Sequence, residues 1–455
     1  MDQPTGAGQV VHASSRARWH AVAASMVGTT VEWYDFAIYG AAASLVFGKI
    51  FFPGFNPTLG LLASYGSFAA GFVARPFGGV VFSYFGDKFG RKPVLAATIL
   101  VMGFATMAIG CLPGYARIGI AAPILLVVLR LIQGFGAGGE FSGAILFASE
   151  YTPSHHRGFF GSFAPASVTL ALVLASGVFA GFAYLPTSQF MAWGWRIPFL
   201  LSIVAVIIGF FIRRRVDETP EYKAVRETAR KVRVPMIEVL RQHPKLVALA
   251  FGTIIAQVMG YLYIVFATAY ITNHAGLSKS FTLATQMICF LIAGVVCVAS
   301  GALSDRIGRR PILFTASIAS AIYGVPLFWL LDTRKPGLVF LAMLFGVMVQ
   351  YPMFGISAAF LTDLFPTKLR YSGITLARES AYALLGGPLP LVATAAVAAA
   401  GGNSWPVSII MLVMGLTSAA CIAMLPRGAG EAGFHADRRD TASDEPRVDL
   451  SMAAP

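Results

Sequence analysis

Two carboxylates and one guanidinium lie inside long apolar stretches of this sequence. Glu32 and Asp35 are three residues apart, so on a helix they share one face. Arg130 lies near the middle of the apolar run from Ala121 to Tyr151. Burial favours the neutral form of a carboxylate and a nearby arginine favours the charged form, so such a group can exchange a proton for a partner. These three residues are the candidates for proton coupling.

Arg130 needs a partner. A guanidinium binds carboxylates through two parallel hydrogen bonds, so the partner is Glu32, Asp35 or the carboxylate of a bound substrate. The alternative is a permanent ion pair that only holds helices together. Because a charge at the centre of a membrane helix is costly and usually faces a polar cavity, we expect a functional role.

Other polar residues in apolar runs are candidates for binding a substrate. Arg75 could serve the same cavity, and a gate or a packing ion pair is an equal alternative for it. In the second half of the chain the position equivalent to Arg130 falls near Leu344, so we expect the first half to handle charge and the second half to hydrogen-bond the substrate. The candidate substrate-binding residues are Tyr34, Arg75, Arg130, Gln133, Gln257, Tyr261 and Gln350.

Acidic and basic residues recur where the apolar runs end. They predict a gate whose charges pair in one state of the protein and separate in another. The alternative is a basic loop that only sets the orientation in the membrane. The candidate gating residues are Asp87, Arg91, Glu150, Asp305, Arg309 and Asp363.

The elements that must position these residues are membrane helices. Of the 455 residues, 56% are hydrophobic and 12% are charged, whereas soluble domains carry about a quarter charged residues. A span needs about 20 apolar residues. On that basis the sequence predicts an all-α polytopic membrane protein with twelve transmembrane helices, at 20–48, 58–86, 93–112, 120–150, 158–184, 194–213, 246–272, 281–303, 311–331, 337–364, 372–400 and 404–425.

Glycines follow Arg130 in the fourth of these runs. Gly134, Gly136, Gly138 and Gly139 carry no side chain, so they leave room for a neighbouring helix to approach closely.

The loops divide the chain and orient it. Most Lys and Arg residues lie in loops that share one side of the membrane if the N-terminus is inside, so we expect both termini in the cytoplasm and read the net charge of +13 as this bias. No cleavable signal is expected. The predicted parts are a tail (1–19), a six-helix bundle (20–213), a charged cytoplasmic linker with short amphipathic helices (214–245), a second six-helix bundle (246–425) and a disordered tail (426–455).

The two halves repeat each other. GDKFGRKP follows the second span and SDRIGRRP follows the eighth. Glu150 is followed by Pro153 and Arg157, and Asp363 by Pro366 and Arg370 at the same offsets. Independent loops rarely agree in this way, so we infer an internal duplication. Two halves repeated in one orientation are the architecture of a rocking transporter, with the substrate site between them near the midplane.

These repeated loops resemble the signature of the major facilitator superfamily. More narrowly, the sequence is similar to the metabolite:proton symporters, a family that includes shikimate, α-ketoglutarate, citrate and proline/betaine carriers. The resemblance covers residues 20–425 and implies a carrier of the bacterial inner membrane. It rests on EWYDFAIYG (32–40), ARPFGGVVF (74–82), RLIQGFGAGGE (130–140), WGWRIPF (193–199) and DETPEY (217–222).

Two neighbouring residues depart from the family pattern. Arg378 and Glu379 stand where related carriers tend to have uncharged polar or aromatic residues. We expect Arg378 to extend toward the inner surface, because long basic side chains near helix ends do so, and Glu379 to point elsewhere on the helix.

The expected function is proton-coupled uptake of a small organic acid or zwitterion by alternating access. The alternative is a proton-coupled antiporter that exports a drug or metabolite; several arginines within the membrane favour an anion. All seven histidines lie outside or at the ends of the spans, and no metal-ligand spacing or phosphate-binding loop occurs. We therefore expect no enzyme activity, no cofactor, no metal and no nucleic acid. The expected partners are protons, the substrate and the lipid bilayer, with the protein a monomer.

Overall fold

The computed structural model describes residues 15–89, 91–138, 156–215, 235–365, 369–426 and 428–430. These residues are helical almost throughout. The helices of the first half are α1 (Ser15–Ala42), η1 (Ala43–Phe47), α2 (Gly48–Ile50), α3 (Pro57–Phe89), α4 (Arg91–Cys111), α5 (Tyr115–Ile118), α6 (Ala121–Ala137), α8 (Arg157–Gly161), α9 (Phe163–Ala183), α10 (Thr187–Ala192), η3 (Gly194–Arg196) and α11 (Ile197–Arg215).

The second half repeats this pattern of long helices and short connections. Its elements are α13 (Pro235–Gln242), α14 (Pro244–Val258), η4 (Leu262–Phe266), α15 (Ala267–Ala269), η5 (Tyr270–His274), α16 (Lys279–Ile307), α17 (Arg309–Leu331), α18 (Pro336–Leu364), α19 (Arg370–Ala381), η6 (Tyr382–Gly386), α20 (Leu389–Ala399) and α21 (Trp405–Met424).

Within the described residues, eight helices are long and apolar enough to cross a membrane, and three shorter apolar helices accompany them. Together with α1, which carries Glu32 and Asp35, they correspond one for one to the twelve predicted spans. Large apolar side chains such as Phe77, Val295 and Trp329 are exposed on the outside of the bundle, as lipid-facing residues are. The predicted fold class is confirmed.

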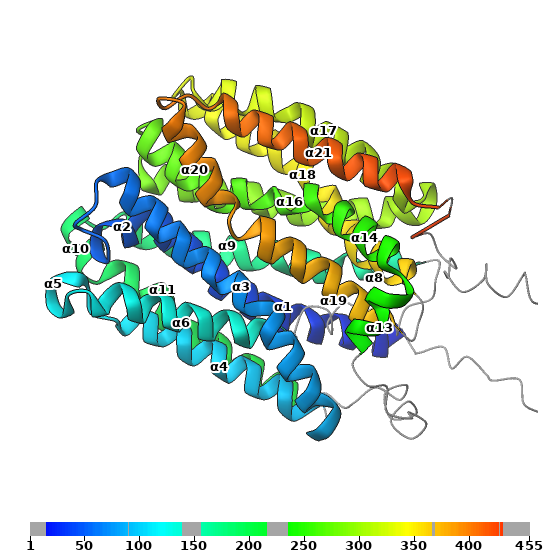
Figure 1. The fold of residues 1–455 in the computed structure, drawn as a ribbon. Helices are drawn as coiled ribbons and strands as arrows, with labels where there is room; N and C mark the ends of the chain where they lie inside the picture. Colours follow the sequence, from blue (N-terminus) through cyan, green and yellow to red (C-terminus); the bar gives the residue numbers. More distant parts are fainter. Residues whose placement is uncertain are drawn as a thin grey trace, which may run out of the picture.

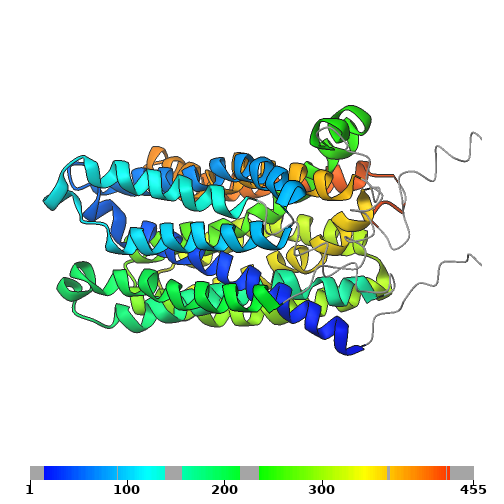
Figure 2. The same ribbon diagram turned by 90° about the horizontal axis from the view of Figure 1, so that it is seen from below.

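The long helices run side by side along one axis (Figures 1 and 2). α1 begins and α21 ends at the same end of the bundle, on the right in Figure 1, as an even number of spans requires. We call this the inner end, following the charge bias of the loops, and the opposite end the outer end. The linker residues 216–234 and the tail residues 431–455 lie outside the described part, as do Glu140 and Gly139.

The two halves meet along four sets of contacts. α8 and α9 of the first half pack against α16 and α18 of the second, α3 packs against α19, η6 and α20, α1 packs against η4, and η1 packs against α15. Three of these elements, η1, η4 and η6, are π-helical turns that interrupt longer α-helices. Such turns are rare and often mark functional sites, and here they border the contact between the halves.

The glycines after Arg130 bring α6 against α3. A side chain on Gly134 would collide with the carbonyl oxygen of Gly71, and one on Gly138 with the carbonyl oxygen of Arg75. The close approach predicted for Gly134 and Gly138 is therefore confirmed. It matters for the site, because this backbone contact fixes the position of α3, which carries Arg75.

Candidate substrate and proton site

A cluster of four buried charges lies where the halves meet. Arg75 on α3 donates a hydrogen bond to Glu32 on α1, and both residues belong to the first half. Arg75 Nη1 also lies 4.0 Å from Oε2 of Glu379, on α19 of the second half. Arg378 Nη1 donates to Oε1 of Glu379 at 2.5 Å. All four residues are buried, the most exposed being Glu379 at 4%.

This arrangement corrects two expectations. Arg378 does not extend to the inner surface: it is 2% exposed and turns toward Glu379, because a buried partner is nearer than water. The expected division, in which the first half handles charge and the second half hydrogen-bonds the substrate, does not match the placement of charges in this cluster, since each half supplies one arginine and one glutamate. Position in the sequence shows how deep a residue lies, but helix rotation decides which neighbour it meets.

Arg130 reaches Asp35 through a chain of side chains. Its Nη1 donates to Gln133 Oε1 at 2.6 Å, Gln133 Nε2 donates to Thr106 Oγ1 at 2.7 Å, and the Thr106 hydroxyl lies 2.7 Å from Asp35 Oδ2. The expected partnership of Arg130 with this carboxylate is thus mediated by two polar side chains. The ion pair of Glu32 is made by Arg75 instead.

Aromatic rings surround Arg75 and Arg130. The guanidinium carbon of Arg130 lies 4.1 Å from the ring centroid of Tyr39 and 4.3 Å from that of Phe36. The guanidinium carbon of Arg75 also lies 4.3 Å from the ring centroid of Phe36. Such contacts stabilise a cation that is shielded from water. Nη2 of Arg130 is buried and has no hydrogen-bond partner among the described residues, so one donor remains for a ligand.

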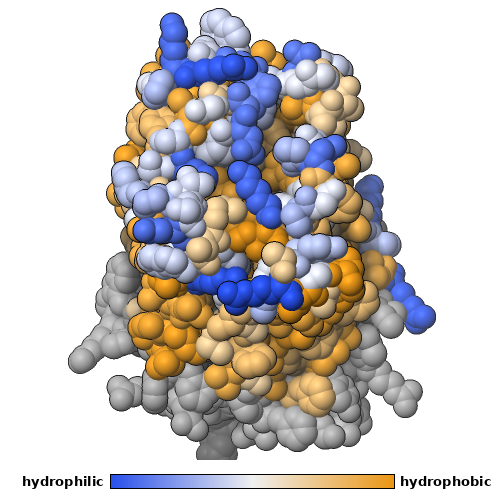
Figure 3. All heavy atoms as spheres, turned by 90° about the vertical axis from the view of Figure 1, so that its left-hand side faces the viewer, coloured by the Kyte–Doolittle hydropathy of each residue, from blue (hydrophilic) through white to orange (hydrophobic). Residues whose placement is uncertain are grey.

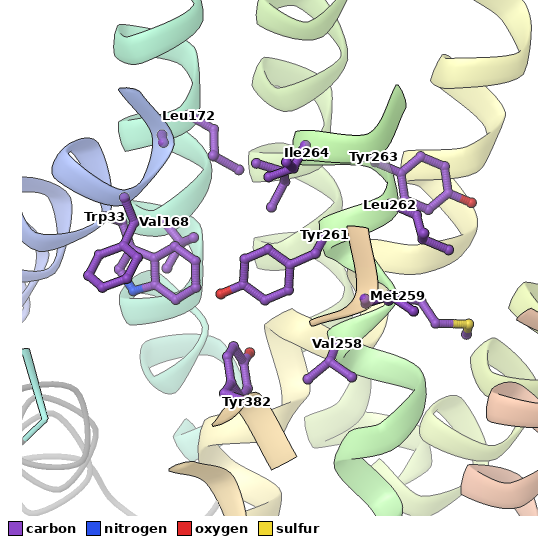
Figure 4. Close-up of a cluster of buried hydrophobic side chains, with 14 of the residues drawn as sticks. Trp33, Val168, Leu172, Val258, Met259, Tyr261, Leu262, Tyr263, Ile264 and Tyr382 are labelled. Carbon is purple, nitrogen blue, oxygen red and sulfur yellow. The ribbon is translucent and has the colours of Figure 1, made fainter. Parts of the chain in front are cut away.

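Three aromatic residues from both halves point toward one another beside this cluster (Figure 4). Trp33 stacks on Tyr261 with ring centroids 6.3 Å apart, and Tyr382 stands edge-on to both, at 6.4 and 5.9 Å. The Tyr261 hydroxyl is buried without a hydrogen-bond partner within the described part of the chain. Because a buried polar group usually has a partner, this hydroxyl is suited to contact a ligand.

The remaining candidate residues lie apart from this cluster. Tyr34 donates to the carbonyl of Pro198 at 3.1 Å, so it ties α1 to α11. Gln257 donates to Ser357 at 3.2 Å, and Gln350 donates to the carbonyl of Ala256 at 2.8 Å, so both join α14 to α18. Their roles in substrate binding stay predictions.

Sequence reasoning missed three residues of the site as built, Trp33, Thr106 and Tyr382, and it singled out Arg378 and Glu379 without assigning them to the site. Trp33 adjoins the charged residue Glu32 inside an apolar run, which is a signal that could have found it. Thr106 and Tyr382 carry no such signal, because ordinary packing explains a threonine or a tyrosine in a helix equally well.

The inner end is closed by contacts between the halves. Asp305 at the end of α16 accepts hydrogen bonds from the backbone amides of Gly158 and Phe159, both at 2.8 Å. Asp363 accepts one from Arg157 at 2.8 Å and another from Arg309. The side chains of Asp87 and Arg91, and the whole of Glu150, lie outside the described part.

The outer end is hollow. A cavity of about 1290 Å³ is lined by residues of both halves, and hydrophilic residues gather on this end of the molecule (Figure 3). Below it, the hydroxyls of Ser44 and Tyr65 donate to the carbonyl of Val265, at 3.0 and 3.2 Å, and so join the halves. The charged cluster therefore lies between a closed inner end and an outer cavity whose floor is closed.

Comparison with known proteins decides the family. The sequence profile of the Major Facilitator Superfamily matches residues 25–390. The shikimate transporter of Escherichia coli K12 is 36% identical over 439 residues, which cover 92% of this chain and 96% of the relative. The inner membrane metabolite transport protein YhjE of the same strain is 38% identical over 377 residues, 81% of this chain and 86% of the relative.

This chain belongs to the Major Facilitator Superfamily. Within it, these relatives place the chain in the metabolite:proton symporter family, as the sequence motifs predicted. Among solved structures, a partially occluded, inward-open form of the xylose transporter XylE from E. coli matches 90% of this chain and 99% of its own with a TM-score of 0.71. At 18% identity that likeness concerns the fold alone. The protein is a multi-pass membrane transporter and not an enzyme.

Proposed function

We propose that this transporter takes up a small organic acid together with protons, by alternating access across a bacterial inner membrane. The observation that carries this proposal is the Arg75-centred cluster, in which buried arginines and carboxylates of both halves lie next to one another. A buried guanidinium can bind a substrate carboxylate. A buried carboxylate that no longer pairs with the guanidinium can be neutralised by a proton instead. Motion of one half against the other would change both contacts.

The proposed cycle assigns the roles predicted from the sequence. The halves, residues 20–213 and 246–425, rock about the cluster. Protonation of Glu32 or Asp35 loosens the hold of these carboxylates on Arg75 and, through Gln133 and Thr106, on Arg130. The substrate anion then engages the arginines. Opening of the Asp305 and Asp363 contacts releases substrate and proton to the cytoplasm, where both termini lie.

The outer cavity supports an anionic substrate. Its ionisable lining residues include Lys49, Lys279 and His274, and among the described residues that line it there is no Asp or Glu. A cavity with basic side chains raises the local concentration of anions and repels cations. A transporter of cationic drugs would be expected to show the opposite charge there.

The test is uptake into proteoliposomes under an imposed proton gradient, acidic outside. The compounds are shikimate, α-ketoglutarate, citrate, benzoate and glycine betaine, each radiolabelled. Arg130→Ala and Glu32→Gln accompany the wild type, and Glu238→Gln, on α13 outside the spans, serves as the matched control. We expect one acid to accumulate in the wild type and in the control, and neither site variant to accumulate it.

The same vesicles distinguish uptake from export. If no compound accumulates but preloaded compounds leave the vesicles when the outside is acidified, the protein is an exporter. The uptake cycle above would then be wrong.

A further inference from the structure

Arg75 lies between two carboxylates that belong to different halves. Glu32 approaches it from α1 in the same half, and Glu379 approaches from α19 at 4.0 Å. When the halves move, α1 and α3 can travel together, whereas the contact of Arg75 with Glu379 crosses the moving boundary. Glu379 also has a second cation, Arg378, within its own half.

The four charges of the cluster cancel, since two arginines face two glutamates. A substrate carboxylate that binds Arg75 adds one negative charge to a site from which water is excluded. An uncompensated buried charge is strongly unfavourable. The imbalance disappears if one of the two glutamates takes up a proton as the substrate enters.

We propose that Glu379 is this group: it occupies the anion-binding position on Arg75 in the empty carrier, and a substrate monocarboxylate replaces it there as Glu379 accepts one proton from outside. The proton leaves to the cytoplasm with the substrate, after which Glu379 returns to Arg75. This inference rests on the proposed function, assigns the transported proton to Glu379 in place of Glu32 or Asp35, and adds the stoichiometry. One proton accompanies each monocarboxylate, and transport carries no net charge.

The surroundings of Glu379 suit this exchange. Among the described residues, the ionisable groups that face it are Arg75 from α3, Arg378 from its own helix, Tyr261 beside η4 and Tyr382 of η6, with Glu32 beyond Arg75. α13, α14 and α18 also pack against α19. Their charged residues are Glu238 and Arg241 on α13, Lys245 in the first turn of α14 and Asp363 in the last turn of α18. Oε2 of Glu379 is buried and accepts no hydrogen bond from the described residues, so it is the oxygen on which a proton can reside.

Glu379→Gln separates the two activities of the carrier, because glutamine imitates the protonated acid permanently. With the acid that the wild type accumulates in the screen above, shikimate being the first probe, this variant should still exchange labelled for unlabelled substrate. It should not accumulate substrate above the external concentration. The wild type should accumulate about tenfold per unit of pH gradient, since one proton moves per anion. Its uptake should not respond to a potassium diffusion potential.

Two control variants accompany the measurement on Glu379→Gln. Glu379→Asp keeps a carboxyl group and should keep gradient-driven uptake with a shifted pH profile, and Glu238→Gln should behave as the wild type. Accumulation by Glu379→Gln at the level of the wild type would overturn the inference, as would uptake that a membrane potential drives. If Glu379→Gln does not fold, the pH profile of Glu379→Asp decides, and an unchanged profile counts against the inference.

A measurement without substrate distinguishes failure of this inference from failure of the proposed function. In the empty carrier, infrared difference spectra between acidic and alkaline buffer should show the C=O stretch of a protonated carboxyl group that is missing in Glu379→Gln. If no acid is taken up by the wild type, the uptake proposal fails, yet loss of this band still identifies Glu379 as a proton acceptor. An identical band in both proteins would rule Glu379 out.

Discussion

The carboxylate of Asp305, at the end of α16, accepts a 2.8 Å hydrogen bond from the backbone amide of Gly158, at the start of α8. The two residues belong to different halves, so this bond and its neighbour from Phe159 close the inner end. α8 begins at Arg157, and the amides at a helix start carry partial positive charge, which makes a carboxylate a favourable partner. The gating role predicted for Asp305 thus has a physical counterpart in the resting contacts.

Asp305→Ala should loosen the inner end. It removes both acceptors and leaves the amides of Gly158 and Phe159 without them, at a cost of about 1–3 kcal/mol. We expect faster hydrogen exchange in the peptide that contains residues 157–163, measured by mass spectrometry in detergent. Asp332→Ala, at the outer end, is the control and should leave this peptide unchanged. Equal exchange in Asp305→Ala and wild type would show that other contacts hold the inner end closed.

Arg75→Gln should destabilise the protein, and more at alkaline than at acidic pH. The change leaves Glu32 and Glu379 facing each other without their shared cation, and loss of one partner of a buried pair costs about 3–5 kcal/mol. Acid neutralises the remaining carboxylates and so reduces the penalty. Melting curves of the detergent-solubilised protein at about pH 5 and about pH 9 test this. Each variant is compared with the wild type at the same pH, because ordinary histidines also change charge between these two values.

The double variant Glu32→Gln/Arg75→Gln provides the comparison for that measurement. It removes one charge of each sign, so most of the lost stability should return while substrate accumulation stays absent. A double variant that is no more stable than Arg75→Gln would mean that Glu32 is not the charge left unpaired.

Thr106→Val should disconnect Arg130 from Asp35. Valine has the shape of threonine but lacks the hydroxyl that links Gln133 to Asp35 at 2.7 Å on each side. We expect the pH optimum of proton-driven uptake to move and the maximal rate to fall about tenfold, as loss of one buried hydrogen bond of about 1.4 kcal/mol implies. Thr106→Ser keeps the hydroxyl and should restore both. An unchanged pH profile in Thr106→Val would remove Asp35 from the proton pathway.

Lys49→Gln/Lys279→Gln should slow uptake of an anion without changing the accumulation ratio. Both lysines line the outer cavity, and long-range attraction by such charges raises encounter rates by about tenfold or more at low ionic strength. The difference from wild type should shrink as salt is added, because salt screens exposed charges. Lys335→Gln alters an outer loop residue that does not line this cavity and serves as the control. If the double variant and the control differ equally from wild type, the cavity does not attract the substrate.

Gly134→Ala should prevent α6 from packing against α3. The added methyl group would overlap the carbonyl oxygen of Gly71, and backbone at such a contact cannot step aside as a flexible side chain can. We expect a large drop in the yield of monodisperse protein on size-exclusion chromatography. Gly181→Ala, on α9, meets no atom within 4 Å and is the matched control. Normal yield of Gly134→Ala would show that the two helices can separate without loss of the fold.

The number and order of the helices were determined by the sequence alone. Length of an apolar run is a local property, so the twelve spans follow from reading along the chain. The charges and motifs of the loops are local as well, and they predict the inner position of both termini and the duplication. The tight contact at Gly134 and Gly138 was predictable for the same reason, since a glycine-rich helix face permits close approach wherever a neighbour lies. The depth of Glu32 and Arg130 in the membrane is likewise predicted by counting residues.

Only the tertiary structure decided which charge meets which. Glu32 pairs with Arg75, Arg130 reaches Asp35 through Gln133 and Thr106, and Arg378 turns inward to Glu379. These contacts depend on the rotation of each helix about its axis and on which helices become neighbours, and the packing of all twelve sets both. Burial then determines which ion pairs form, because a charged side chain that cannot be solvated by water pairs with the nearest opposite charge, whichever half of the chain supplies it.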